Sequence, residues 1–317
     1  MEYIKGTTTF KIEKPTVLSL GKFDGLHRGH ELLMDYVFKK KKEGLKAAIF
    51  TFDIPPRKNV EHVQAQVLTT NEEKERLFEN IGIDYLIECP FTEEIMCLEP
   101  EAFIEMIVNQ LNVKCMVVGT DFHFGHNRRG DYHLLLQYAP EYGYEVEVVD
   151  KMQEDGRDIS STFVREQIMA GNMEKANELL GYRYFVEGTI LHGRKMGKAV
   201  LGIPTINLIP PEEKLLPPFG VYLSVTEWNG REYPGITNIG CKPTVEGVNP
   251  VGVETHIFDF DEDVYGKDVK VSFLKRVREE KKFESLDALK NQMRQDIETG
   301  KCYFSEKQDI TQMLQKP

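Results

Sequence analysis

The chain has 317 residues, a length that predicts about two domains. Its hydrophobic fraction of 41% and charged fraction of 29% are typical of a globular protein and exclude a disordered, collagen-like or membrane protein. A formal net charge of −11 argues against a broad nucleic-acid-binding surface, which would be basic, but not against a nucleotide pocket with local donors. The five cysteines form no CxxC pair, so reduced thiols are expected rather than disulfides or a zinc site.

No segment approaches the run of about 18 apolar residues that a membrane helix needs. The first residues also lack the apolar core of a signal peptide. The sequence therefore predicts a cytoplasmic protein whose partners include neither a membrane nor a nucleic acid, and it leaves weak self-association open.

Strand-like and helix-like segments alternate through the first half of the chain. Short apolar runs predict strands over residues 16–20, 47–52, 85–88, 115–118 and 144–149. Helices are predicted after His30, after a capping box formed by Thr70 and Glu73, and over residues 101–111, 162–170 and 173–180. This alternation predicts an α/β domain, in which a parallel sheet carries helices on its faces.

The second half changes to short strands with frequent Gly and Pro, which predicts a closed antiparallel β-barrel. The predicted strands cover residues 184–189, 221–226, 253–260 and 269–273. Asn229 and Gly230 predict a hairpin turn, and residues 285–299 predict a terminal helix that ends at Gly300. The expected domains are therefore residues 1–181, residues 182–307 and a short tail over 308–317.

A glycine-rich turn over residues 21–30 lies between the first strand and the first helix. Its glycines allow the backbone to approach a ligand closely, and the helix that follows presents free N–H groups to an anion. His27 and His30, in an H-x-G-H arrangement, can donate hydrogen bonds to phosphate oxygens. Two histidines three residues apart also fit half a metal site, but the sequence groups no Cys or carboxylate with them.

A second phosphate-binding composition occurs over residues 159–165, at a predicted helix start. Ser160, Ser161 and Thr162 offer hydroxyl groups, and Arg165 follows one turn later. The alternative is an ordinary N-cap, which Ser and Thr supply routinely.

Together these segments resemble known enzymes. H-x-G-H is the pattern of the nucleotidyltransferase superfamily, whose members transfer a nucleotide from ATP and release pyrophosphate. Residues 21–30, 118–125 and 159–165 occur in the order seen in prokaryotic bifunctional riboflavin kinase/FMN adenylyltransferases, also called FAD synthetases. The resemblance implies flavin contacts from Asp121 and Phe122. It implies that ATP and its phosphates are bound by His27, His30, Gly21, Phe23, Asp24, Gly25, Gly29, Ser160, Thr162 and Arg165. The sequence departs from the family at Phe163, where an arginine is usual, and in the spacing of the aromatic and proline turn over residues 51–56.

The barrel half contains a basic loop with Gly193 and Lys198, followed by Thr205 and Asn207. In an extended segment Thr205 and Asn207 point to the same face, and their side-chain oxygens suit Mg²⁺. A plain turn is the alternative reading of these residues.

The barrel half resembles the same family. The resemblance implies phosphate binding by Gly193 and Lys198, a flavin contact from Asn238 and a catalytic base at Glu254. An outward-facing barrel glutamate is the alternative for Glu254. Ile206 and Lys198 depart from the usual Ala and Arg.

The resemblance implies an α/β Rossmann-like nucleotidyltransferase domain followed by a flavokinase β-barrel with a C-terminal helix. The implied function is phosphorylation of riboflavin to FMN and adenylylation of FMN to FAD, with ATP, riboflavin and FMN as substrates and Mg²⁺ as cofactor. Two alternatives stay open: an enzyme with only one live activity, and a non-catalytic flavin-binding sensor.

Overall fold

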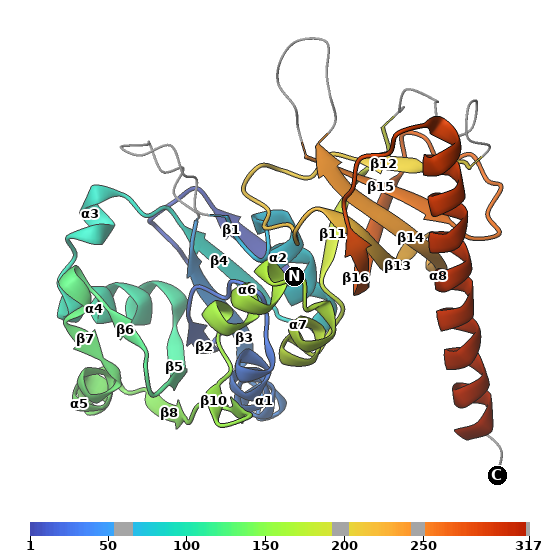
Figure 1. Ribbon diagram of the computed structural model, residues 1–317. Coiled ribbons are helices and arrows are strands. Elements are labelled where there is room, and N and C mark those ends of the chain that lie inside the picture. The colour runs from blue at the N-terminus through green and yellow to red at the C-terminus, as the bar shows by residue number, and fades with distance from the viewer. Residues whose placement is uncertain (54–65, 192–202, 242–250, 315–317) are drawn as a thin grey trace. The chain divides into compact units, whose positions relative to one another are not determined.

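The computed structural model describes residues 1–53, 66–191, 203–241 and 251–314, with side chains of the last helix described through residue 306. Contacts divide the chain into two compact units, Met1–Phe163 and Val164–Pro317. Each unit is built on a six-stranded sheet of its own (Figure 1).

The first unit contains a parallel sheet with the strand order β1-β4-β3-β2-β5-β8. Its strands are β1 (Glu2–Lys5), β2 (Thr16–Leu20), β3 (Lys46–Phe52), β4 (Tyr85–Cys89), β5 (Val113–Gly119) and β8 (Glu145–Val149). Its helices are α1 (Arg28–Lys42), α2 (Asn71–Ile81), α3 (Glu93–Met96), α4 (Pro100–Leu111) and α5 (Tyr132–Tyr142). The shorter elements are β6 (His123–Phe124), η1 (His126–Arg128), β7 (Gly130–Asp131), β9 (Gln153–Glu154) and β10 (Arg157–Asp158). The predicted parallel α/β sheet is confirmed, although β1 was not expected, because this four-residue edge strand has no buried residue.

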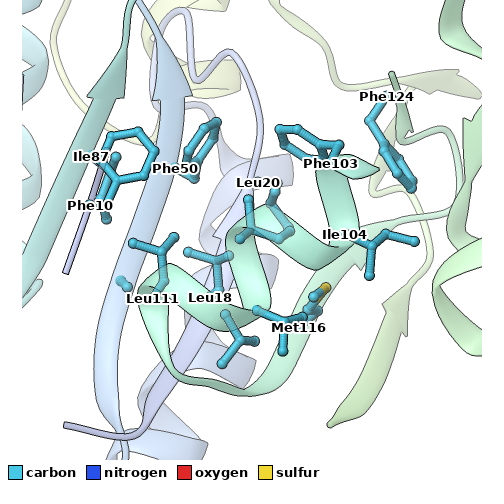
Figure 2. Close-up of a cluster of buried hydrophobic side chains, with 14 of the residues drawn as sticks. Phe10, Leu18, Leu20, Phe50, Ile87, Phe103, Ile104, Leu111, Met116 and Phe124 are labelled. Carbon is cyan, nitrogen blue, oxygen red and sulfur yellow. The ribbon is translucent and has the colours of Figure 1, made fainter. Parts of the chain in front are cut away.

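A cluster of buried side chains fills one face of this sheet (Figure 2). Leu18 and Leu20 of β2 and Phe50 of β3 lie there with Phe103 and Ile104 of α4. Every residue of β2 is buried, as expected for a central strand of a parallel sheet covered on both faces.

The predicted capping box at the start of α2 is present. The Thr70 hydroxyl accepts the Glu73 N–H at 3.2 Å, and the Glu73 carboxylate accepts the Thr70 N–H at 3.0 Å. Gly82, in the left-handed conformation, ends this helix. The start of α2 is therefore fixed, which matters because the residues just before it bind the turn after β2.

The order of the parallel strands reverses between β2 and β5. From β2 the sheet extends through β3 and β4 on one side, whereas β5 and β8 lie on the other. In open parallel sheets ligands bind outside the carboxyl ends of the strands at such a reversal. The segments that follow β2 and β5, residues 21–30 and 120–122, begin at this point.

The second unit contains an antiparallel sheet with the strand order β11-β16-β13-β14-β15-β12. Its strands are β11 (Phe185–Thr189), β12 (Ile206–Leu208), β13 (Gly220–Trp228), β14 (Arg231–Cys241), β15 (Val251–Ile257) and β16 (Asp268–Glu279). An isolated antiparallel bridge between Leu191 and Asn207 links the residues after β11 to β12 at the opposite edge. The sheet thus nearly closes, and the predicted barrel is confirmed.

The hairpin between β13 and β14 is also confirmed. Asn229 and Gly230 have φ angles of 51° and 71°, the left-handed values that a tight hairpin turn requires.

Two short helices precede the barrel strands, α6 (Ser161–Met169) and α7 (Met173–Leu180), and Gly171 and Gly181 follow them as expected. The Asn177 side chain of α7 donates to the Phe273 carbonyl at 2.8 Å and accepts the Tyr184 N–H at 2.7 Å. These contacts attach α7 to β16 and to the start of the barrel.

The terminal helix α8 (Leu286–Leu314) continues past Gly300, so the prediction that Gly300 ends it is wrong. A Cβ atom at Gly300 would lie 2.7 Å from the ring of Phe258, so the glycine permits close packing instead of capping the helix. Glycine inside a helix costs about 1 kcal/mol. Burial offsets that cost, because Ile297 and Phe304 of α8 pack on Phe258 and its buried neighbours.

Candidate active sites

The turn after β2 places the H-x-G-H residues at the start of α1. The helix begins at Arg28, earlier than expected, so His27 is its N-cap and His30 lies in the first turn. The His27 carbonyl accepts the N–H of His30 at 2.7 Å. The first N–H groups of a helix have no partner inside it, so those of Arg28 and Gly29 can face an anion at the positive end of the helix dipole.

The rings of His27 and His30 stack on each other, with centroids 3.7 Å apart and an interplanar angle of 17°. His30 Nδ1 donates to the Gly25 carbonyl at 3.2 Å, whereas His27 Nδ1 is buried without a hydrogen-bond partner among the described residues. Burial lowers the pKa of His27 to about 4, and burial and the neighbouring His27 lower the pKa of His30 well below its usual value. Both rings are therefore neutral near pH 7, and each carries one N–H.

The conformation of the turn is fixed by side-chain contacts to the segment that precedes α2. Asp24 Oδ1 accepts the N–H groups of Leu68 at 2.7 Å and Thr69 at 3.3 Å. The Thr69 hydroxyl in turn accepts the Gly25 N–H at 3.1 Å, where Gly25 has a φ of 68°. Asp24 thus serves the turn itself, and Thr69 is a site residue that the sequence reasoning missed.

Gly21 and Gly29, near the two ends of the turn, leave room for the neighbouring rings of Phe23 and His27. A Cβ atom at Gly29 would lie 3.1 Å from His27 Nδ1 and 3.3 Å from the Ile159 carbonyl. A Cβ atom at Gly21 would lie 3.1 Å from the Phe23 ring, which is buried and packs edge-on against Phe78. The Phe23 side chain therefore belongs to the core, and only its backbone can face a ligand.

The start of α6 contacts this turn through Ser161, whose hydroxyl was expected to face phosphate. The Ser161 hydroxyl donates to the Asp24 carbonyl at 2.7 Å. Ser160 accepts the Phe163 N–H at 3.2 Å, which is the N-cap contact considered as the alternative. The predicted phosphate-binding Thr162 is exposed, and Arg165 lies one turn further along α6. At Phe163, where the family has an arginine, the guanidinium of Arg157 lies 4.2 Å from the ring centroid.

The segment after β5 carries the two predicted flavin contacts of the first unit. Asp121 is exposed and pairs with Lys151 at 3.1 Å. Phe122 is half-buried and stacks on Phe124, with ring centroids 5.5 Å apart and an interplanar angle of 18°. These aromatic faces are suited to a flat heteroaromatic ring. Residues 54–56 of the proposed aromatic and proline turn lie outside the described residues.

The barrel site is a row of side chains across three neighbouring strands. Glu254 of β15 lies opposite Asn207 of β12 on one side and Asn238 of β14 on the other. Directly paired residues in an antiparallel sheet point to the same face, so the carboxylate and the two amides lie together. The Thr205 hydroxyl donates to Glu254 Oε1 at 2.6 Å. The structure therefore brings together Thr205, Asn207, Asn238 and Glu254, whereas Gly193 and Lys198 lie outside the described residues.

The donor atoms at this row are a hydroxyl, amides and one carboxylate, an oxygen set of the kind that Mg²⁺ accepts together with water and phosphate. Within the ranges that the structure describes, no three His, Cys, Asp or Glu side chains are grouped to hold a metal ion. The sites thus offer anion-binding donors in the first unit, and a base with hard oxygen ligands in the second.

The H-x-G-H turn lies where the strand order of the parallel sheet reverses, and it defines the first unit as nucleotidyltransferase-like. The second unit is a nearly closed barrel that carries the row of polar side chains around Glu254. The family model for FAD synthetase matches residues 9–163, and that for riboflavin kinase matches residues 180–304. The chain belongs to the family of bifunctional riboflavin kinase/FMN adenylyltransferases, transferases of flavin cofactor biosynthesis. The resemblance stated from the sequence is confirmed.

Individual relatives cover nearly the whole chain. A bifunctional riboflavin kinase/FMN adenylyltransferase from Escherichia coli is 35% identical over 91% of this chain and 92% of its own length. The protein of that description from Listeria monocytogenes is 33% identical over 92% of this chain and 94% of its own.

One solved structure is also similar throughout. It is described as a macrolide-efflux protein from Streptococcus pneumoniae, and it is 30% identical with a TM-score of 0.83 over 94% of this chain and 98% of its own. In the present chain, none of the helices within the described residues is long and apolar enough to cross a membrane.

Proposed function

We propose that each unit carries one of the two reactions, and that the residues described above perform them. The second unit transfers the γ-phosphoryl group of ATP to the ribityl 5′-hydroxyl of riboflavin, which gives FMN and ADP. The first unit transfers AMP from a second ATP to the phosphate of FMN, which gives FAD and pyrophosphate. The observation that carries the proposal is the presence of two separate polar groupings, each within a unit matched by a different family model.

In the adenylyl transfer, the FMN phosphate is the nucleophile and is ionised near neutral pH, so no strong base is needed. Positioning and stabilisation of charge supply the catalysis. Neutral His27 donates its N–H to the ATP phosphates and to the developing pyrophosphate, whereas His30, whose N–H goes to the Gly25 carbonyl, stacks on His27 and holds its ring in place. The unpartnered His27 Nδ1 supports this role, because buried polar atoms in native proteins normally have a partner, which a ligand can supply.

Three further groups complete this site. The backbone at Gly21, Gly25 and Gly29 approaches the nucleotide closely. The start of α6 binds phosphate oxygens through Ser160 and Thr162. Asp121 and Phe122 hold the flavin.

In the kinase reaction, Glu254 orients the 5′-hydroxyl of riboflavin and accepts its proton. The hydrogen bond from Thr205 holds one carboxylate oxygen and thereby orients the other. Thr205 and Asn207 would hold Mg²⁺, because a hydroxyl and an amide oxygen on the face of a carboxylate are donors of the kind that this ion accepts. Bound there, Mg²⁺ would neutralise charge on the phosphates of ATP. Asn238 contacts the flavin, and Gly193 and Lys198 bind phosphate.

The test is incubation of the protein with riboflavin, ATP and Mg²⁺, followed by identification of products by mass. We expect FMN to appear first and FAD with pyrophosphate to follow, and chelation of Mg²⁺ to prevent phosphorylation. FMN without FAD would contradict a live site in the first unit. Flavin binding without turnover would instead support the sensor.

A further inference from the structure

His256 is a half-buried side chain that the two reactions leave without a role. It lies on β15, two residues after Glu254 and therefore on the same face of the strand. Its Nδ1 lies 2.8 Å from the Pro204 carbonyl oxygen. A carbonyl oxygen can only accept, so the hydrogen is on Nδ1 and the imidazole donates this bond.

Pro204 has no N–H, so its carbonyl is its one backbone group for hydrogen bonding. The ladder between β12 and β15 begins at Ile206, which pairs with Thr255, so Pro204 and Thr205 precede the paired strand. Side chains of β15 hold this segment instead. His256 binds Pro204, and Glu254 accepts the hydrogen bond of Thr205 at 2.6 Å.

The imidazole of His256 packs against Phe258, a side chain that the terminal helix covers. Its ring meets Phe258 at a centroid distance of 5.8 Å, and Phe258 in turn packs against Gly300 and Phe304 of α8. Burial is the main cause that lowers the pKa of His256, and the hydrogen bond to the Pro204 carbonyl opposes it; the charge of Lys301 lowers the pKa further and that of Asp259 raises it. The ring is thus neutral near pH 7, with its one N–H committed to Pro204.

We propose that His256 is a positioning residue of the riboflavin kinase site: through the Pro204 carbonyl it fixes the backbone that presents Thr205 to Glu254 and to Mg²⁺. The inference rests on the proposed roles of Thr205 and Glu254. Without the bond from His256, the Pro204 carbonyl is no longer held by β15. The Thr205 hydroxyl then spends less time in hydrogen-bond contact with Glu254. Riboflavin has no contact with His256 in this account, so its binding is unaffected.

The experiment compares three substitutions in the full-length protein. His256→Asn keeps a donor close to the position of Nδ1, His256→Gln places its donor near the position of Nε2, and His256→Ala removes the donor. We expect His256→Ala and His256→Gln to lower kcat by ~10-fold, the effect of one hydrogen bond, and to raise the Mg²⁺ concentration for half-maximal rate. The kcat of His256→Asn is expected to stay within about threefold of that of the unchanged protein. The KM for riboflavin is expected to stay constant in all three variants.

Two controls separate this inference from the function on which it rests. His123→Ala removes a histidine that makes the same kind of contact, to the Asp121 carbonyl at 2.9 Å in the other unit, and should leave the kinase rate unchanged. Thr205→Ala and Glu254→Gln test the assigned site. If these two lower the kinase rate and His256→Ala does not, the positioning role is wrong and the site stands. If neither Thr205→Ala nor Glu254→Gln lowers the kinase rate, the proposed site itself is wrong.

Equal losses of kinase kcat in His256→Asn and His256→Gln would also overturn the proposal, because the loss would then come from the missing packing of the ring and not from the missing Nδ1 donor. Circular dichroism and the rate of FMN adenylylation report whether each variant is folded. The comparison between the Asn and Gln variants, which have similar chemistry, remains decisive if His256→Ala fails to fold.

Discussion

The two candidate sites differ in what positions their side chains: a turn and helix starts in the first unit, and paired strands in the second. In the first unit, the functional groups lie on a turn and on helix starts, and contacts such as that of Asp24 with Leu68 and Thr69 fix their backbone. In the second unit, Asn207, Glu254 and Asn238 lie in one row across paired strands. The first arrangement depends on glycines and local hydrogen bonds, whereas the second depends on strand register. The comparison predicts that each site can be disabled without damage to the other.

The largest effect is expected at the strand-borne site. Glu254→Gln keeps the size of the side chain but removes the proton-accepting carboxylate, so riboflavin phosphorylation should fall by ~10²–10⁴. Steady-state kinetics with riboflavin and, separately, with FMN measure the two half-reactions. FMN adenylylation should be unchanged, and Glu227→Gln, at an exposed glutamate of β13, is the matched control. Full kinase activity in Glu254→Gln would remove Glu254 from the site.

The next effect concerns the turn-borne site. Removal of both rings in the His27→Ala, His30→Ala double variant should lower FAD formation from FMN by ~10²–10³, because the His27 donor to the transition-state charge is lost together with the His30 ring that stacks on it. Pyrophosphate release during FMN adenylylation measures this rate. Riboflavin phosphorylation should persist, and His133→Ala on α5 provides a control substitution. Near-normal FAD formation by the double variant would refute the assignment.

The buried histidines also predict a pH dependence of stability. The pKa of His27 is about 4 in the folded protein and about 6.5 when unfolded. Between these values the unfolded state binds a proton that the folded state does not, so the free energy of unfolding falls as the pH is lowered. The full effect of His27 is on the order of 3 kcal/mol. Denaturant titrations at pH 7 and pH 5 should show a larger loss for the unchanged protein than for His27→Asn, and equal losses would contradict the burial argument.

The smallest effect tests the packing of α8 on the barrel. Gly300→Ala should raise helix propensity by about 1 kcal/mol, yet its methyl group would press on the ring of Phe258. Overpacking of this kind costs about 1–3 kcal/mol, so the midpoint of thermal unfolding should fall by a few degrees. Thr299→Ala, at the exposed neighbouring position, is the control. A higher midpoint for Gly300→Ala would show that the glycine does not serve close packing.

Much of the architecture could be predicted from the sequence, because buried strands and amphipathic helices leave periodic patterns. The alternation in the first half, the Asn229-Gly230 hairpin and the capping box of Thr70 and Glu73 are all present in the structure. The pattern fails where glycine has two uses: Gly300 resembles a helix stop in sequence, and only the ring of Phe258 reveals that it serves packing.

The sites were predictable in part. The H-x-G-H turn and the pair of Thr205 and Asn207 carry residue types that their chemistry requires, so they could be singled out, whereas Glu254 was assigned from the resemblance. Thr69 and the contact of Ser161 with Asp24 were missed, because the bonds of Thr69 to Gly25 and of Ser161 to Asp24 join segments distant in sequence. His256 could be placed on the Glu254 face, but its bond to Pro204 depends on the pairing of β12 with β15.

The separation of the two sites is tested most directly by mixing two disabled proteins. Glu254→Gln alone should convert FMN to FAD but leave riboflavin unphosphorylated, and the His27→Ala, His30→Ala protein alone should stop at FMN. Because FMN can diffuse from one protein to the other, a mixture of the two with riboflavin, ATP and Mg²⁺ should form FAD at a rate that neither approaches alone. A mixture that forms no FAD, although both variants are folded, would contradict the assignment of one activity to each unit.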